Sequence, residues 1–190
     1  VLASSGVLHI GSAGNDGSAA GNGNNVSYPA RYESVVAVAA LDKNNLRASF
    51  SSTGSDVEIA APGVFVLSTW KDSTNFAGPL PFSFAGYAGE YFIEANGTSM
   101  ASPHVAGVAA LLMGSNPGYT AEAVRNKMNE TALDLGATGK DNLYGYGLVD
   151  ASLALEIDSI ANHPPVAYNQ AVHTTQNTAV AISLIAADPD

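Results

Sequence analysis

Two stretches near the start of the chain are apolar at consecutive positions rather than at alternate ones. They cover residues 7–10 and 34–40. Such runs are typical of strands that are covered on both faces, as in a parallel sheet. A third run, over residues 99–113, is apolar on nearly all sides of a helix and predicts a helix that is buried centrally. The pattern therefore favours an α/β fold.

Two further helices are predicted towards the C-terminal side. Ala121, Val124 and Met128 fall on one helical face, and Thr120 precedes them as a candidate N-cap. Residues 148–155 show a similar spacing over a shorter length and would close the domain.

The composition changes near residue 158. Residues 162–165 resemble a linker, and the segment after them alternates Thr and Val in the manner of strands. We therefore expect a first domain over residues 1–157, a linker over 158–165 and the beginning of a β-module over 166–190. That last segment has about 25 residues, too few for an independent sandwich domain, so we expect the module to be truncated.

Composition and charge exclude several classes of function. The apolar content of 46% is enough for a core, and 17 Asp and Glu against 7 Lys and Arg give a net charge of −10. A nucleic-acid partner is disfavoured, because such binding needs clustered basic residues. The absence of Cys excludes thiolate nucleophiles and zinc–cysteine sites, and no run reaches the roughly 18 apolar residues of a membrane span.

A serine stands where the apolar helix is about to begin. Thr98 and Ser99 precede the long apolar run, and free N–H groups at a helix N-terminus favour developing negative charge. The position suits a nucleophile whose reaction creates an oxyanion. The same residues would also suit a helix cap, since Ser and Thr are preferred there.

The string around this serine is more specific than a cap requires. Residues 97–104 read GTSMASPH, which closely resembles the active-serine signature of the subtilisin-like serine proteases. A second match, SAGNDG over residues 12–17, follows the first predicted strand, although Asn-Asp-Gly alone is ordinary turn chemistry. The resemblance covers roughly residues 1–157. It implies the C-terminal portion of a three-layer α/β fold with a parallel sheet, followed here by a short β tail.

The resemblance also implies roles for individual residues. Ser99 would attack the peptide carbonyl of a polypeptide substrate, and the side-chain amide of Asn15 would hold the oxyanion together with the backbone N–H of Ser99. Ser12, Ala13 and Gly14 would line one wall of the pocket for the side chain that precedes the scissile bond. In the intact parent these residues would serve a secreted or cell-surface serine endopeptidase.

The Asp and His of the triad are expected outside this sequence. The family carries them in earlier motifs that are absent here, so we expect the upstream half of the catalytic domain to be required and the fragment alone to be inactive. None of the 4 His is a credible replacement. His104 lies in the same helix as Ser99 but projects from a different turn, and His9 lies in an apolar strand.

Other expectations concern cations and the loop before the serine. The chemistry requires no cofactor or catalytic metal, but the resemblance allows a structural calcium ion at the carbonyls of Ala30, Tyr32 and Val35. The tail resembles the opening of cadherin-like or immunoglobulin-like bacterial modules, whose Asp-Pro-Asp can also bind calcium. The aromatic segment 71–95 is predicted to be a long loop or a small hairpin. It would either shape the leaving-group side of the cleft or simply pack as a hairpin.

A catalytically inactive relative is the alternative function. Such a protein would keep Ser99 by descent and act as a binding or surface-adhesion module. The resemblance alone does not separate this alternative from the protease.

Overall fold

The apolar runs near the start of the chain form a parallel sheet. In the computed structural model, β1 (His9–Ser12), β2 (Val35–Leu41) and β3 (Ile59–Pro62) lie in the order β1-β2-β3. Both pairings are parallel. The described residues are 6–69, 84–87, 92–156, 166–167, 176–177 and 186–187. Among them, no helix is both long and apolar enough to cross a membrane.

The central strand β2 is covered on both faces, as its unbroken apolar run predicts. Val36, Val38 and Ala40 belong to one buried cluster. The intervening Ala37 and Ala39 belong to a second cluster on the opposite face. Successive side chains of a strand point to opposite faces, so a strand buried on both sides must be apolar at every position.

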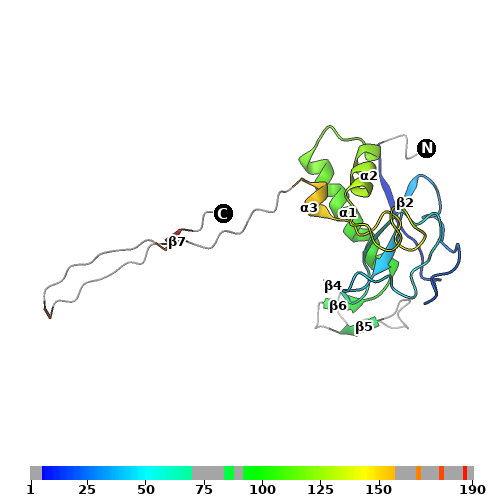
Figure 1. The fold of residues 1–190 in the computed structure, drawn as a ribbon, viewed down its shortest axis with the longest axis horizontal. Coiled ribbons are helices and arrows are strands. Elements are labelled where there is room, and N and C mark those ends of the chain that lie inside the picture. The colour runs from blue at the N-terminus through cyan, green and yellow to red at the C-terminus, as the bar shows by residue number, and fades with distance from the viewer. Residues whose placement is uncertain are drawn as a thin grey trace. The chain divides into compact units, whose positions relative to one another are not determined.

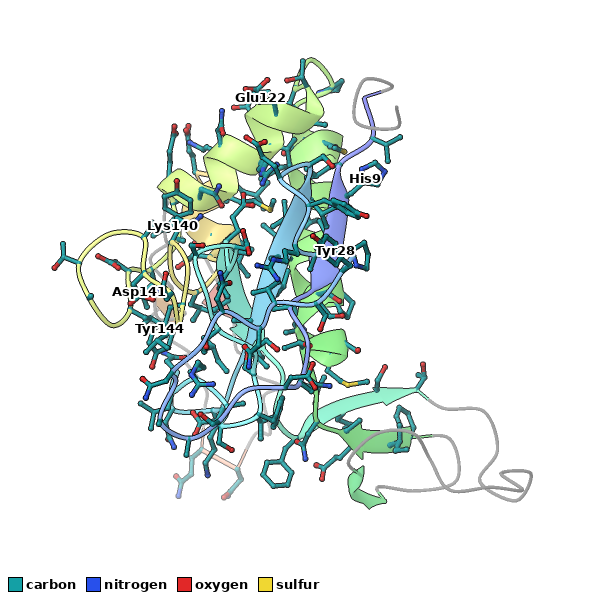
Figure 2. The ribbon with its side chains drawn as sticks, turned by 90° about the vertical axis from the view of Figure 1, so that its right-hand side faces the viewer. His9, Tyr28, Glu122, Lys140, Asp141 and Tyr144 are labelled. Atoms are coloured by element: carbon teal, nitrogen blue, oxygen red, sulfur yellow. The ribbon has the colours of Figure 1, made fainter. Side chains whose placement is uncertain are left out.

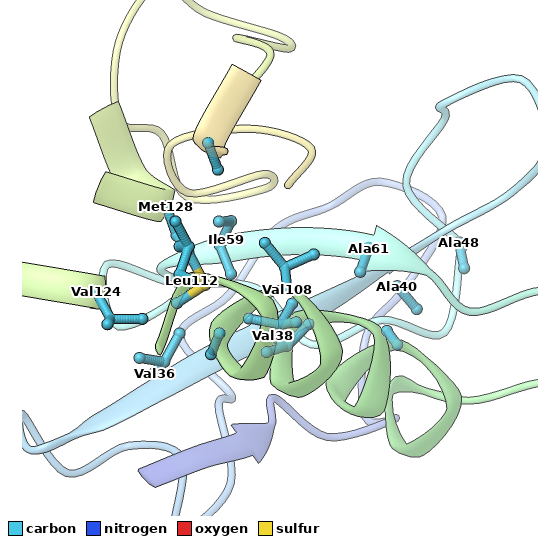
Figure 3. Close-up of a cluster of buried hydrophobic side chains, with 14 residues drawn as sticks. Val36, Val38, Ala40, Ala48, Ile59, Ala61, Val108, Leu112, Val124 and Met128 are labelled. Atoms are coloured by element: carbon cyan, nitrogen blue, oxygen red, sulfur yellow. The ribbon is translucent and has the colours of Figure 1, made fainter. Parts of the chain in front are cut away.

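The first cluster is formed with helix α1 (Thr98–Ser115). Val105, Val108 and Leu112 of α1 pack in this cluster with Val38 of β2 and Ile59 of β3. Figure 3 shows α1 running along this face of the sheet, with Val108 and Val38 in the same buried cluster. The helix thereby fixes its own N-terminal turn relative to the strands.

One expectation for α1 is wrong within the described residues, because the helix is not enclosed on nearly all sides. Leu111 is 54% exposed, and Ala106, Gly107 and Ala110 are exposed beside it. Apolar residues occur on every face of the helix, but the sheet covers only one of these faces. An open apolar groove borders this surface, lined partly by Val7 and Leu8.

Two further helices complete this part of the fold. α2 (Ala121–Glu130) begins where predicted, with the Thr120 hydroxyl accepting a hydrogen bond from the Ala123 N–H. Val124 and Met128 are buried against the α1 side of the sheet (Figures 1 and 3). α3 is shorter than the predicted segment 148–155 and covers Ala151–Ala154.

A smaller antiparallel sheet precedes the serine. β4 (Val66–Thr69), β5 (Phe84–Tyr87) and β6 (Phe92–Ala95) are arranged in the order β4-β6-β5. Strands at 84–87 and 92–95 favour the hairpin form of the predicted segment 71–95, whose other residues lie outside those described. Immediately after β6 the chain enters α1.

The chain divides into two compact units, Val1–Glu156 and Ile157–Asp190. In the second unit, β7 (Val166–Ala167) pairs antiparallel with β8 (Ala186–Ala187). The assignment of this unit to a cadherin-like or immunoglobulin-like module stays a prediction, and Asp188–Asp190 lie outside the described residues.

Candidate active site

Ser99 is the second residue of α1 rather than its cap. Gly97 occupies the N-cap position and provides no side-chain hydrogen bond, and Thr98 is the first helical residue. The capping interpretation of Thr98 and Ser99 is therefore wrong. Ser99 is exposed, and its hydroxyl has no hydrogen-bond partner in the part of the chain that the structure describes. A free hydroxyl in the first turn of a helix is available for chemistry.

Asn15 lies directly against this helix start. Its Oδ1 accepts one hydrogen bond from the Thr98 backbone N–H and one from the Thr98 hydroxyl, both at 3.0 Å. The Thr98 hydroxyl in turn accepts a bond from the Gly14 N–H at 3.2 Å. Contacts between residues more than 80 positions apart thus join the loop after β1 to the first residue of α1.

These contacts decide which way the Asn15 amide faces. The Thr98 N–H can only donate, so it must meet the amide oxygen, and the amide NH₂ must point elsewhere. A Cβ built on Gly97 would lie 3.5 Å from Asn15 Nδ2 and 3.7 Å from the backbone nitrogen of Ser99. The glycine therefore keeps open a small space that both nitrogens border.

The loop that carries Asn15 is held by backbone contacts. Gly14 accepts a hydrogen bond at its carbonyl from the Ser52 N–H at 2.9 Å, and its φ is +111°. A Cβ at Gly14 would lie 2.7 Å from Ser27 Oγ, closer than side chains approach one another. The positive φ favours glycine here, and a Cβ would also require the Ser27 and Ser52 side chains to shift.

A groove borders Ser99 on the side of the antiparallel sheet. It has a volume of about 320 Å³ and is open to solvent. Its lining comes from β4 and from the first turns of α1: Val66, Leu67, Ser68, Ser99, Met100, Pro103 and His104. Nearby, the Phe65 N–H donates to Asn96 Oδ1 at 2.6 Å and the Gly97 N–H donates to the Gly63 carbonyl at 2.8 Å. These bonds tie β4 to the start of α1.

No base is hydrogen-bonded to Ser99 among the described residues. His104 lines the same groove, but its Nδ1 lies 2.8 Å from the Met100 carbonyl oxygen in its own helix. That oxygen can only accept, so the contact places the proton on Nδ1. His9 lies on β1 (Figure 2). His163 and His173 lie outside the described residues.

The predicted pocket residues follow one another at the end of β1. Ala13 is fully buried in the second core cluster, while Ser12 and Gly14 are half-buried. Their role in holding a substrate side chain stays a prediction.

The predicted calcium ligands are backbone carbonyls. The Tyr32 carbonyl already accepts a hydrogen bond from the Val35 N–H at 2.8 Å. Among the described residues, no group of three or more His, Cys, Asp or Glu side chains could hold a metal ion. Calcium prefers several oxygen ligands, usually including carboxylates. A structural calcium ion here therefore stays a prediction.

Thr98 is the functional candidate that the sequence did not reveal as such. It is 1% exposed and links Gly14 to Asn15, whereas the sequence indicated only a cap. The feature of the sequence that could have pointed to Thr98 is a polar residue between Gly97 and Ser99, at the N-terminus of a helix predicted to be buried.

Comparison with known proteins gives a consistent result. The model of the Subtilase family matches residues 2–147. Subtilisin DY of Bacillus licheniformis is 43% identical over 80% of this chain, and the chain spans 48% of that protein. A thermostable alkaline protease of Halalkalibacterium halodurans is 45% identical over 80% of the chain, which spans 35% of it.

A solved structure shows the same relationship in three dimensions. The crystal structure of a lanthipeptide protease matches 82% of this chain and 52% of its own, with a TM-score of 0.68 and 29% identity. The family model, the identities and the shared architecture agree with one another. The chain belongs to the subtilase family.

Proposed function

We propose that this chain supplies the nucleophile and one oxyanion donor to a serine endopeptidase. The observation that carries the proposal is the shared space beside Gly97. It is bordered by Met100 Sδ, the Asn15 amide nitrogen and the Ser99 backbone nitrogen, and the Ser99 hydroxyl is exposed, with no hydrogen-bond partner among the described residues.

The chemistry follows from those positions. The Ser99 oxygen attacks the carbonyl carbon of a polypeptide, its proton passes to a base, and the carbonyl oxygen becomes negatively charged. Asn15 Nδ2 and the Ser99 N–H donate to that oxygen, which is stabilised further by the positive end of α1. Collapse of the intermediate expels the amine and leaves an acyl group on Ser99, which water then removes.

The base belongs to a part of the parent protein beyond these residues. The chain spans about half of subtilisin DY, and no described His is hydrogen-bonded to Ser99. The exposed apolar side of α1, around Leu111, is a surface that the remaining part of the domain would cover. Both observations support a requirement for an upstream half.

The test uses the complete parent protein and peptide hydrolysis. We expect Ser99→Ala to abolish turnover and Ser102→Ala, a matched change in the same helix, to retain it. Asn15→Ala should lower kcat by about 100- to 1000-fold, a magnitude that was itself established in a subtilisin. A Ser99→Ala variant that still hydrolyses peptides at the parent rate would refute the assignment.

The alternative, a catalytically inactive binding or adhesion module, gives a different outcome. The parent would then bind peptides without cleaving them, and a fluorophosphonate probe would fail to label Ser99. Labelling in the parent but not in a folded 1–190 chain would instead support the proposal that the base lies outside these residues.

The groove beside Ser99 suggests where the leaving group lies. β4 lines it through Val66, Leu67 and Ser68, and β4 pairs with β6. We therefore assign the hairpin to the leaving-group side of the cleft. Shortening segment 71–91 in the parent should change sequence preference after the scissile bond. An unchanged preference would leave the hairpin with a packing role only.

We also propose that the parent acts outside the cell, with residues 166–190 beginning an appended β-module. A cysteine-free, acidic chain is compatible with that location. Detection of the parent in culture medium, and the sequence downstream of residue 190, test these two points.

A further inference from the structure

Arg47 makes an unusual set of contacts behind the Asn15 loop. Its Nη1 donates to the carbonyls of Ser51 at 2.6 Å, Ala48 at 3.0 Å and Ser49 at 3.5 Å, and its Nη2 donates to the Ser18 carbonyl at 2.6 Å. No carboxylate pairs with it in the described part of the chain. Burial lowers the pKa of this guanidinium. The guanidinium therefore donates its hydrogen bonds to backbone carbonyls and forms no ion pair with the described residues.

Those carbonyls belong to two segments, residues 48–51 and the loop that continues from Asn15 to Ser18. The Gly17 N–H donates to the Phe50 carbonyl at 2.8 Å, and the Asp16 N–H donates to Ser52 Oγ at 3.2 Å. These bonds hold the residues that directly follow Asn15. Arg47 therefore connects two segments. One of them holds the Asn15 loop in place, and the other is the loop itself.

The two segments are in direct backbone contact. A Cβ on Gly17 would overlap the carbonyl of Ser51, the same carbonyl that Arg47 holds at 2.6 Å. No side chain lies between them to absorb a displacement. A shift of the Ser51 carbonyl would move Gly17 and, two residues earlier, the Asn15 amide.

Arg47 is itself anchored from a third direction. Its backbone N–H donates to the Tyr144 hydroxyl at 3.3 Å. Tyr144 lies beside Asp141 in the loop before α3 (Figure 2), and its N–H and that of Leu143 donate to Asp141 Oδ1, each at 2.8 Å. The backbone of Arg47 is therefore held by a residue from the C-terminal side of the domain.

We propose that Arg47 is a positioning residue for the Asn15 amide, acting through the Ser51 and Ser18 carbonyls. The inference rests on the proposed function of Asn15 as an oxyanion donor. It differs from a purely structural role in one respect. Loss of Arg47 should weaken transition-state stabilisation through Asn15 and leave substrate binding nearly unchanged.

The experiment is a double-mutant cycle in the complete parent protein. Arg47→Met keeps the aliphatic stem and removes every carbonyl contact, and Arg47→Lys keeps the charge. We expect Arg47→Met to lower kcat about tenfold with little change in KM, and Arg47→Lys to recover part of the loss, since small misplacements of catalytic groups can reduce rates up to about 100-fold. In an Asn15→Ala background the same substitutions should change kcat less than about twofold. Arg31→Met removes an exposed cation that pairs with Asp56 and should leave kcat unchanged in both backgrounds.

The outcomes separate this inference from the proposed function. A parent protein without Ser99-dependent hydrolysis refutes the proposed function itself. A parent that depends on Ser99 and Asn15, but loses the same factor on Arg47→Met in both backgrounds, overturns only the positioning role. If Arg47→Met does not fold, the double-mutant cycle is measured with Arg47→Lys in its place. We then expect a reduction of about threefold that disappears with Asn15→Ala, and a persistent reduction overturns the proposal.

Discussion

Glu58 is a buried carboxylate whose charge is balanced by one helix. The residue is 5% exposed, and its Oε1 accepts hydrogen bonds from Arg125 Nε at 2.6 Å and from Asn129 Nδ2 at 2.8 Å. Arg125 Nη2 donates to the second carboxylate oxygen. Hydrogen bonding to Glu58 raises the pKa of Arg125. The pair joins α2 to the residue that precedes β3.

Arg125→Met should destabilise the protein by about 3 kcal/mol. Removing one partner of a buried ion pair costs about 3–5 kcal/mol, because the remaining charge stays desolvated and uncompensated. The Arg125 side chain is 26% exposed, so water can reach the vacated position and the lower end applies. That change shifts the unfolding equilibrium by more than about a hundredfold. Urea unfolding of the complete protein followed by circular dichroism measures it, in a Ser99→Ala background that prevents self-digestion.

A matched control lies two residues along the same helix. Lys127 pairs with Glu156, whose side chain is 77% exposed, so Lys127→Met should leave stability nearly unchanged. Replacing both Arg125 and Glu58, as Arg125→Met with Glu58→Leu, should restore part of the loss, because no unpaired charge remains. The reasoning is refuted if Arg125→Met is no more destabilising than Lys127→Met, or if the double variant is less stable than Arg125→Met alone.

The remaining predictions concern the helix start, a close approach and an exposed ion pair. Thr98→Val removes the hydroxyl that orients the oxyanion amide and should lower kcat of the parent about tenfold, with KM nearly constant in steady-state kinetics. Gly145→Ala should destabilise more than Gly139→Ala in urea unfolding. Both glycines have positive φ, but only at Gly145 would a Cβ meet backbone atoms. A hydrogen bond from Lys127 lowers the pKa of Glu156, so the small stabilisation is present above the ordinary carboxyl pKa and fades as pH falls through the lowered value. Lys127→Met should return that pKa towards its ordinary value in an NMR titration.

Much of the fold could be predicted because its signals are local. The unbroken apolar run at 34–40 became a strand buried on both faces, and Thr120 capped the helix whose apolar spacing it precedes. Both patterns depend on a few consecutive residues and on the periodicity of strands and helices. The eight-residue string GTSMASPH at residues 97–104 was specific enough to indicate the family.

The predictions that were wrong depend on the three-dimensional surroundings of a residue and not on its neighbours in the sequence. The side of α1 near Leu111 is exposed in the structure, although its residues are apolar. Apolar residues indicate a preference for burial, but they do not show which element, if any, covers them. The cap assignment failed because Gly97, not a hydroxyl residue, precedes the first helical residue. Thr98 was missed because its role is a contact with Asn15, 83 residues away in sequence.

The proposed function separates two requirements of acyl transfer. The proposed nucleophile Ser99 and the proposed oxyanion donor Asn15 are held by contacts inside the chain, since Thr98 bridges the loop after β1 and the start of α1. Those contacts depend on the parallel sheet and on α1 packing against it, and they need no base to form. Proton transfer, by contrast, requires a group that the described residues do not place beside Ser99. Under the proposed function, stabilisation of the developing charge comes from contacts within this chain, and activation of the nucleophile depends on a base supplied by another part of the parent protein.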